Sequence, residues 1–512
     1  MNSHAEMPVR RAIKATTMEV EKEMRDALVQ RLAASSEPCA IAFDGWTNVV
    51  QSKVTNIVLV CEGRAFYWCS IANRSERNTA AWMQQAMHPH IDELLSRGVR
   101  LAGFIADNES VNTALFNLLT EKYPFFIRVP CAAHTVQLVV KSSMATERWK
   151  RVRDGVEELL KAFALKDPRQ QLMTLQQTAT NSSLNLIKPN DTRWNSFLFA
   201  CVRMLKLRDF IQLIHRREDS FWSEMQALVD FLLPFQIATD VLQKDAATLY
   251  DIFQQWNILT KHILANTAGP EQRHSMSALR QRWSGQVNNE ATMSTAVLAL
   301  DLKLDGIMRE DIDAAKKFIV NWGATYLSFF KLSSHPSVQL KGLLWVQLGH
   351  LATRKEAFAE LDERISMTKL AIGVKWNALT VWASYDMELA VVARALLSIP
   401  ASEASVERSF SAQDSIHTKK RNSLHDATVQ ASMFIAFNTR ALASSSAIVR
   451  RETELSVDFM ETDTESQSDS DDEPVQLEEK FDDEMDVDID DASADEQLEE
   501  VPAEELRRTY SE

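Results

Sequence analysis

Three apolar runs that follow one another decide the fold expected for this chain: AIAFDGW at residues 40–46, TNIVLVCEG at 55–63 and RAFYWCSIA at 64–72. All three are rich in residues that favour strands, so they predict three consecutive strands. Helical and strand patterns then alternate. We expect helices at 78–98, 109–124 and 132–145, and strands at 101–108 and 125–131. A three-strand meander followed by strand–helix units predicts a mixed α/β layer fold.

Helix is expected to dominate the rest of the chain. Gly and Pro account for only 12 and 13 of the 512 residues, which is too few for a turn-rich all-β protein. From about residue 147 to 385 the strand signal disappears, and amphipathic helical patterns such as FWSEMQALVDFLLPFQIATDVL fill the sequence. We therefore predict a large helical block inserted after the α/β unit.

Charge is divided unevenly along the chain. Residues 451–512 hold 26 Asp and Glu but 4 Lys and Arg, whereas the first 450 residues hold 45 acids and 52 bases. The acidic tail is too poor in apolar residues to fold, so we expect it to be disordered. A mildly basic body is compatible with a phosphate-bearing partner.

Cysteine usage and the absence of long apolar runs indicate the cellular setting. The five cysteines form no CxxC pair, and the first residues lack the apolar core of a signal peptide. We see no run of about 18 apolar residues, so we expect no membrane span. A reducing compartment, the cytosol or the nucleus, is expected.

Two carboxylates stand at predicted strand ends. Asp44 lies in FDGWT at the end of the first strand, and Asp107 lies in FIADN at the end of the fourth. Carboxylates on neighbouring strand tips can bind a hard divalent cation, and a third acid would complete a two-metal site for phosphoryl chemistry. On spacing alone, the alternative that both aspartates simply begin turns is favoured.

Two shorter motifs carry weaker signals. Cys131 and His134 form one CxxH pair, which lacks the second pair that a structural zinc site needs. TRWN follows at 192–195, where Arg193 could hold a phosphate and Trp194 could stack on an unpaired base. A tryptophan at a helix start is more often core filling.

The densest stretch is IPASEASVERSFSAQDSIHTKKRNSL at residues 399–424. Val406 and Phe410, four residues apart on a helix, would face inward and place Glu407 at the edge of the buried stripe. A basic cluster follows, usable for phosphate contact or equally a solvated surface. It consists of His417, Lys419, Lys420 and Arg421.

Together the ordered motifs FDGWT, ADN, CxxH, TRWN and PASEASVERSFS…KKRNSL resemble the hAT superfamily of cut-and-paste DNA transposases. The last block resembles the hAT C-terminal dimerisation region. The resemblance implies an RNase H-like core interrupted by a helical insertion, and a metal-binding catalytic triad of Asp44, Asp107 and Glu407. With Mg²⁺ or Mn²⁺ the triad would cleave and transfer DNA strands.

The same resemblance implies further roles. His134 would lie near the site, Arg193 would position phosphates, and Trp194 would stack on a flipped base. The partner would be DNA in the nucleus, and no small-molecule substrate is expected. The chain would form a homodimer or higher homo-oligomer. The apolar stripe expected to mediate it, or else to pack on the chain's own insertion, holds Val429, Met433, Phe434 and Phe437.

Departures from the family pattern leave a second function open. No Cys/His set of a BED-type finger precedes Asp44, and Glu109 follows Asn108 where the family usually has a small residue. The alternative is a domesticated, non-enzymatic derivative that dimerises and binds nucleic acid or protein.

The sequence is expected to divide into five regions. They are a helical lead (1–36), the first part of the core (37–146), the insertion (147–384), the dimerisation region completing the core (385–445) and the acidic tail (446–512).

Overall fold

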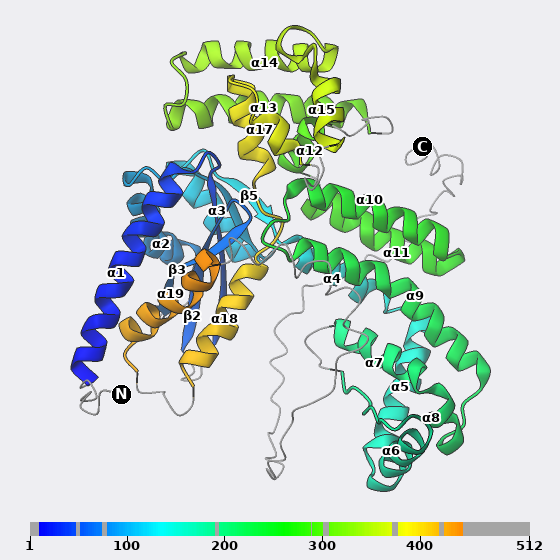
Figure 1. Ribbon diagram of the computed structural model, residues 1–512. Helices are drawn as coiled ribbons and strands as arrows, with labels where there is room; N and C mark the ends of the chain where they lie inside the picture. Colours follow the sequence, from blue (N-terminus) through cyan, green and yellow to red (C-terminus); the bar gives the residue numbers. More distant parts are fainter. Residues whose placement is uncertain are drawn as a thin grey trace. The chain divides into compact units, whose positions relative to one another are not determined.

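The computed structural model describes residues 10–47, 52–73, 79–189, 194–287, 289–300, 307–370, 377–418 and 424–443 (Figure 1). The acidic tail expected to be disordered lies outside these residues. Helix α1 (Arg10–Ala34) buries Leu28 and Leu32.

A five-stranded mixed sheet forms from the predicted strands, in the order β3-β2-β1-β4-β5. Strand β1 pairs antiparallel with β2 and parallel with β4. In turn, β2 pairs antiparallel with β3, and β4 pairs parallel with β5. The mixed α/β prediction is therefore confirmed. The strands are β1 (Cys39–Thr47), β2 (Lys53–Cys61), β3 (Arg64–Asn73), β4 (Leu101–Ala106) and β5 (Ile127–Pro130).

The centre of the sheet is fully covered. Every residue of β4 is buried, as is typical of a parallel strand packed on both faces, and Phe104 contacts Phe43 with ring centroids 4.8 Å apart. Helices follow the strands where the sequence predicted them. These helices are α2 (Ala80–Ser96), α3 (Ser110–Lys122) and α4 (Ala132–Ser143).

Between residues 147 and 384 the described elements of regular structure are helices joined by loops, with one isolated β-bridge of Thr248 to Pro400. Where this block begins and ends as a domain stays a prediction. Its α-helices are α5 (Glu147–Ala164), α6 (Lys166–Thr180), α7 (Trp194–Lys206), α8 (Arg208–Ile214), α9 (Asp219–Leu242), α10 (Leu249–Asn266), α11 (Gly269–Arg282), α12 (Glu290–Leu298), α13 (Arg309–Phe329), α14 (Ser337–Thr353), α15 (Leu361–Leu370) and α16 (Ala378–Trp382). A π-helical turn (Trp283–Val287) and a 3₁₀ turn (Glu356–Phe358) join them.

Helix α9 bears on the expectation of no membrane span. By length and composition it could cross a membrane, since one 18-residue window has a mean hydropathy of 1.3. However, 56% of that window is buried inside the protein, and Trp222, Met225 and Phe235 are among its fully covered side chains. The core helix of a soluble protein passes the same test, so this helix is weak evidence for a membrane.

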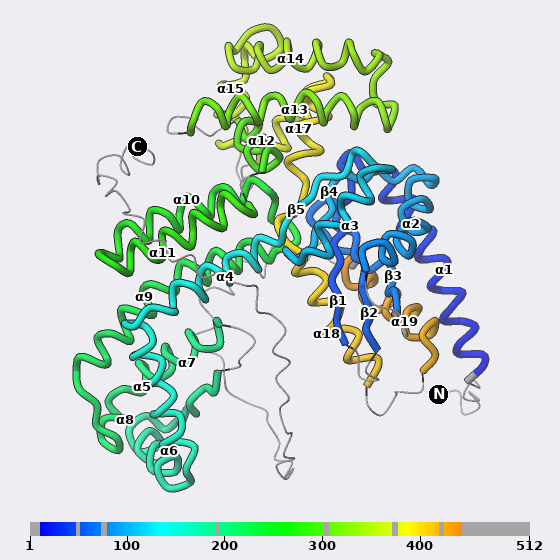
Figure 2. Tube along the Cα trace, turned by 180° about the vertical axis from the view of Figure 1, so that it is seen from behind, coloured from blue at the N-terminus to red at the C-terminus, as the bar shows by residue number. Residues whose placement is uncertain are grey.

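Of the last three helices, two return to the sheet, whereas the first packs against helices of the preceding block (Figure 2). The three are α17 (Glu388–Leu397), α18 (Ala404–Ile416) and α19 (Asp426–Ala443). The loop before α18 is tied down by the backbone, because the amide of Ala132 donates to the carbonyl of Ala401 at 3.1 Å and the amide of Ala401 donates to that of Ala247 at 3.0 Å. These bonds fix the start of α18 beside the start of α4.

Candidate acidic site

Asp44 and Asp107 belong to neighbouring parallel strands. Asp107 follows the last residue of β4, but β1 stays paired with β2 for three residues beyond Asp44, so the prediction that Asp44 ends its strand is wrong. Ala42 of β1 pairs with Ile105 of β4, and this register, continued by two residues, brings Asp107 beside Asp44. The carboxylate of Asp107 is oriented locally, since its Oδ1 accepts from the backbone amide of Glu109 at 3.0 Å and from Nδ2 of Asn112 at 2.6 Å.

The pKa of Asp44 reports how many acids surround it. This pKa is raised to about 6, chiefly by burial of the half-buried side chain, although the Gly45 amide donates to the carboxylate and works in the opposite direction. The negative charges of Asp107, Glu407 and Glu109 contribute to the same rise. Acids from two other parts of the sequence therefore act on this carboxyl group.

Helix α18 reaches this edge because it docks on β1 and β2. Asn56, which is fully buried and pairs with Asp44 across the strands, donates from Nδ2 to Ser409 Oγ at 2.9 Å and to Gln413 Oε1 at 3.0 Å. On the neighbouring turn, Phe410 stacks on Trp46 with ring centroids 5.2 Å apart. Glu407 precedes Ser409 and Phe410 by two and three residues, which is less than one turn, so this docking holds it near β1.

The predicted orientation of α18 is confirmed in outline. Val406 is fully buried and Phe410 is half-buried, while Glu407 is exposed beside that stripe. Although it is exposed, its charge acts on Asp44 and on Glu403, which places it at the acidic edge rather than on an unrelated surface.

Glu403 is an acidic residue of the site that the sequence motifs did not single out. It caps the start of α18, is only 5% exposed, and its Oε2 is buried without a hydrogen-bond partner. Burial raises its pKa well above the usual range, and the charges of Asp44 and Asp107 raise it further, against a hydrogen bond from Cys131. The sequence signal that could have indicated Glu403 is its position four residues before Glu407, because residues four apart lie on one face of a helix.

The CxxH pair borders the same site. Cys131 is buried at the start of α4, where it contacts Glu403, as the simpler interpretation of a buried cysteine predicted. His134 follows in the first turn, and its charge opposes the rise in the pKa of Glu109 that Asp107 and burial cause. His134 and Glu109 therefore lie close to the acidic cluster, as the sequence led us to expect.

The donor chemistry of the cluster suits a hard divalent cation, because carboxylate oxygens predominate and Glu403 carries an unpartnered buried oxygen. Within the described part of the chain, however, no three His, Cys, Asp or Glu side chains are grouped closely enough to hold a metal ion. The predicted metal ligands Asp44, Asp107 and Glu407 would have to draw together around an ion. Their role as ligands stays a prediction.

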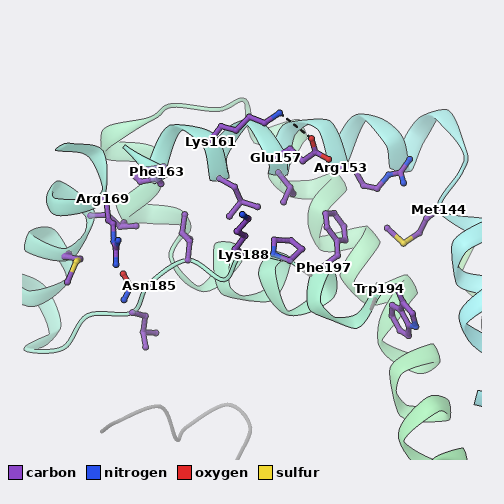
Figure 3. A pocket seen from close by; sticks show the side chains of 18 of the residues that line it. Met144, Arg153, Glu157, Lys161, Phe163, Arg169, Asn185, Lys188, Trp194 and Phe197 are labelled. Atoms are coloured by element: carbon purple, nitrogen blue, oxygen red, sulfur yellow. Dashed lines mark ion pairs between the residues drawn. The ribbon is translucent and has the colours of Figure 1, made fainter. Parts of the chain in front are cut away.

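Of the residues predicted to contact nucleic acid, Trp194 is the one placed in a cavity. It begins α7 and lines a pocket of about 1210 Å³ between α4, α5, α6, α7 and the segment 184–189 (Figure 3). Four others lie outside the described residues, so their predicted roles are not addressed by the structure. These are Arg193, Lys419, Lys420 and Arg421.

The predicted dimerisation stripe is largely covered by the chain itself. Val429, Met433 and Phe434 are at most 4% exposed, and Phe437 is half-buried. Helix α19 packs on α1 and β3 rather than on the insertion: the Arg25 guanidinium lies 4.3 Å from the Phe434 ring centroid. A dimer that used this stripe would exchange these contacts for those of a second copy. The assignment stays a prediction.

Replacing Asn56 by Ala is expected to destabilise the protein by roughly 1–3 kcal/mol, because Ser409 and Gln413 would lose their buried donor. Urea unfolding measures this change. The matched substitution Asn117→Ala, at an exposed position of α3, should alter the free energy of unfolding by less than about 0.5 kcal/mol. Equal effects of both substitutions would contradict the docking role of Asn56.

Comparisons with known proteins agree with the order of the motifs. Residues 8–159 match a family described as a domain of unknown function, DUF659, and residues 356–439 match the hAT family C-terminal dimerisation region. The chain is also 20% identical over 493 residues to the "Putative transcriptional regulator tpeD" of Talaromyces stipitatus, a match that covers 85% of this chain and 57% of that protein. The chain thus spans little more than half the length of this relative. The family matches support the recognition made from the motifs: the chain is similar to the hAT superfamily of DNA transposases, and residues 356–439 match that family's C-terminal dimerisation region.

Proposed function

We propose that this hAT-like, transposase-derived protein cleaves and transfers DNA strands in a metal-dependent reaction that uses Asp44, Asp107 and Glu407. One observation carries the proposal: the charges of Asp107 and Glu407 both raise the pKa of Asp44, although Glu407 is more than 350 residues away in the sequence. Carboxylates gathered in this way repel one another, and a bound cation would relieve that repulsion.

The fold supports an RNase H-like core. Its mixed five-stranded sheet presents the two aspartates side by side on adjacent parallel strands, and a helix from the far end of the sequence adds the glutamate. The long helical stretch between these parts corresponds to the insertion that the resemblance implies.

The three acids would act together in the proposed reaction. Asp44, Asp107 and Glu407 would hold Mg²⁺ or Mn²⁺. Hydrogen bonds from Asn112 and from the Glu109 amide keep the Asp107 carboxylate in one orientation. The bound cations would make water or a 3′-hydroxyl a stronger nucleophile and stabilise the leaving oxygen. His134, at the start of α4, would contact the substrate phosphate beside the acids.

DNA would approach this edge in the nucleus. Arg193 would hold phosphates and Trp194 would stack on an unpaired base, with Lys419, Lys420 and Arg421 adding phosphate contacts. These assignments follow from the family resemblance, and the position of Trp194 in a cavity supports the one that the structure addresses.

The dimerisation region leads us to expect a homodimer or higher homo-oligomer. Light scattering of the purified chain at micromolar concentration should give a mass of at least twice the 58.1 kDa of one copy. The substitution Phe437→Ser, at the half-buried member of the stripe, should lower that mass. A wild-type chain that scatters as a monomer would contradict this expectation.

Nicking of supercoiled plasmid DNA tests the proposed activity. The wild type should nick DNA with Mn²⁺ and not in EDTA, and each of Asp44→Ala, Asp107→Ala and Glu407→Ala should abolish the reaction. Nicking that survives all three substitutions would refute the triad.

A non-enzymatic derivative is the second candidate. It is favoured by the similarity to a protein named as a putative transcriptional regulator, and by the finding that the acids of the described residues are not grouped closely enough to hold an ion. Under this alternative the wild type would bind DNA or a protein partner, and no divalent cation would support nicking.

A further inference from the structure

The cavity that contains Trp194 has a lining of one predominant charge. Five of its lining residues are Lys or Arg, whereas one is acidic, Glu157, and that side chain is paired with Lys161 at 3.6 Å. The unpaired cations come from four segments. They are Lys141 of α4, Arg153 of α5, Arg169 of α6 and Lys188 of the segment that follows α6 (Figure 3).

These four cations have no anionic partner among the described residues, although other basic side chains of the same helices do. Arg148 on α5, for example, pairs with Glu224 at 2.6 Å. In addition, Nε of Arg153 is buried without a hydrogen-bond acceptor. A buried donor without an acceptor is costly unless a ligand supplies one. Lys141, Arg169 and Lys188 are exposed, so the half-buried Arg153 is the cation that most favours an anionic ligand in the cavity.

The remaining wall is apolar and aromatic. Val156, Phe163 and Leu172 form a covered floor, and the half-exposed rings of Trp194 and Phe197 border the same space. Rings next to unpaired cations can accept a stacked base while the cations bind its phosphates. The volume of about 1210 Å³ exceeds the roughly 300–1,000 Å³ of small-ligand pockets, which favours several linked nucleotides over a single one.

The cavity and the acidic site both border helix α4. Gln137 and Lys141 line it, and they follow His134 on one face of α4 at three and seven residues. At a rise of 1.5 Å per residue, Lys141 lies about 10 Å along the helix from His134. A strand leaving the acidic edge along α4 would therefore enter the cavity within a few nucleotides.

We propose that this cavity binds an unpaired DNA strand, with Lys141, Arg153, Arg169 and Lys188 on its phosphates and Trp194 and Phe197 on its bases. The proposal extends the proposed DNA-processing function to a binding site for the displaced strand. It requires neither cleavage nor a metal ion.

Fluorescence anisotropy of a labelled eight-residue oligothymidine, titrated with the full chain in EDTA, tests it. The double substitution Arg153→Gln with Arg169→Gln should weaken binding about tenfold and reduce the slope of log K against log salt by roughly 1.4, or 0.7 per lost phosphate contact. Trp194→Ala should weaken binding and leave the slope unchanged, because stacking releases no counterions.

Arg151→Gln is the matched control, because Arg151 is an exposed residue of α5 that does not line the cavity. It should change affinity less than about twofold. Should the double variant unfold, as judged by circular dichroism, Lys188→Gln on the exposed segment should still reduce the slope by about 0.7.

Three results would overturn the proposal: equal weakening by Arg151→Gln, equally effective competition by a blunt duplex, or displacement by thymidine monophosphate at the same concentration as the oligonucleotide. The outcome is separable from that of the proposed nuclease. Asp107→Ala should bind the oligonucleotide like the wild type, so loss of nicking alone leaves the cavity assignment intact.

Discussion

Glu407→Gln is expected to lower the rate of Mn²⁺-dependent nicking about a thousandfold, equivalent to about 4 kcal/mol of transition-state stabilisation. The substitution keeps the size of the side chain and removes the charge that acts on Asp44. Because Glu407 is exposed, the variant should fold normally, and its melting temperature should stay within about 2 °C of the wild type.

Asp414→Asn provides the control for this experiment. Asp414 is an exposed acid of the same helix, seven residues and so about 10 Å farther along α18. Its replacement should leave the nicking rate within about twofold of the wild type. If both variants lose activity equally, general charge on α18 rather than the position of Glu407 would govern the reaction.

Much of the fold was predictable because its signals are local. The runs around Phe43, Val58 and Phe104 are long enough and sufficiently rich in strand-forming residues to predict their strands, and helical periodicity predicted the helices between them. The strand ends then placed Asp44 and Asp107 together, since the carboxyl ends of parallel strands share one edge of a sheet.

The rest of the site depends on contacts that no local pattern contains. Asn56 lies inside an apolar strand and joins α18 only because residues more than 350 positions away fold back on it. No motif singled out Glu403, because the burial of its unpartnered oxygen arises from the joint packing of α4, β1 and α18. The cavity likewise takes its cations from four segments, so no single stretch of the sequence contains the set.

Glu403→Gln is expected to stabilise the metal-free protein at pH 8 by on the order of 3 kcal/mol. In the folded chain the pKa of Glu403 is raised, first by burial and then by Asp44 and Asp107, while in the unfolded chain it is ordinary. Below about pH 4 both states hold the proton, and no penalty exists. As the pH rises, the unfolded chain releases its proton first, so the wild type loses stability.

Asp44 also lowers the stability of the folded wild type as the pH rises. This loss of stability is complete once the pH exceeds the folded-state pKa of Asp44, about 6. Urea unfolding in EDTA at pH 5, 6, 7 and 8 should therefore show the advantage of Glu403→Gln growing with pH. Glu388→Gln should show the opposite sign. Burial acts against the Glu388 carboxylate, but hydrogen bonds from Gln347 and Ser333 outweigh it and lower its pKa, so the wild-type charge stabilises the fold above the usual pKa and is lost as the pH falls.

A Glu403→Gln variant that is less stable than the wild type at pH 8 would show that the native carboxylate has a stabilising partner there. The repulsion among the acids would then already be offset in the absence of a cation. The electrostatic argument for a divalent ion at Asp44, Asp107 and Glu407 would lose its main support, because a cluster without excess repulsion gains little from binding one.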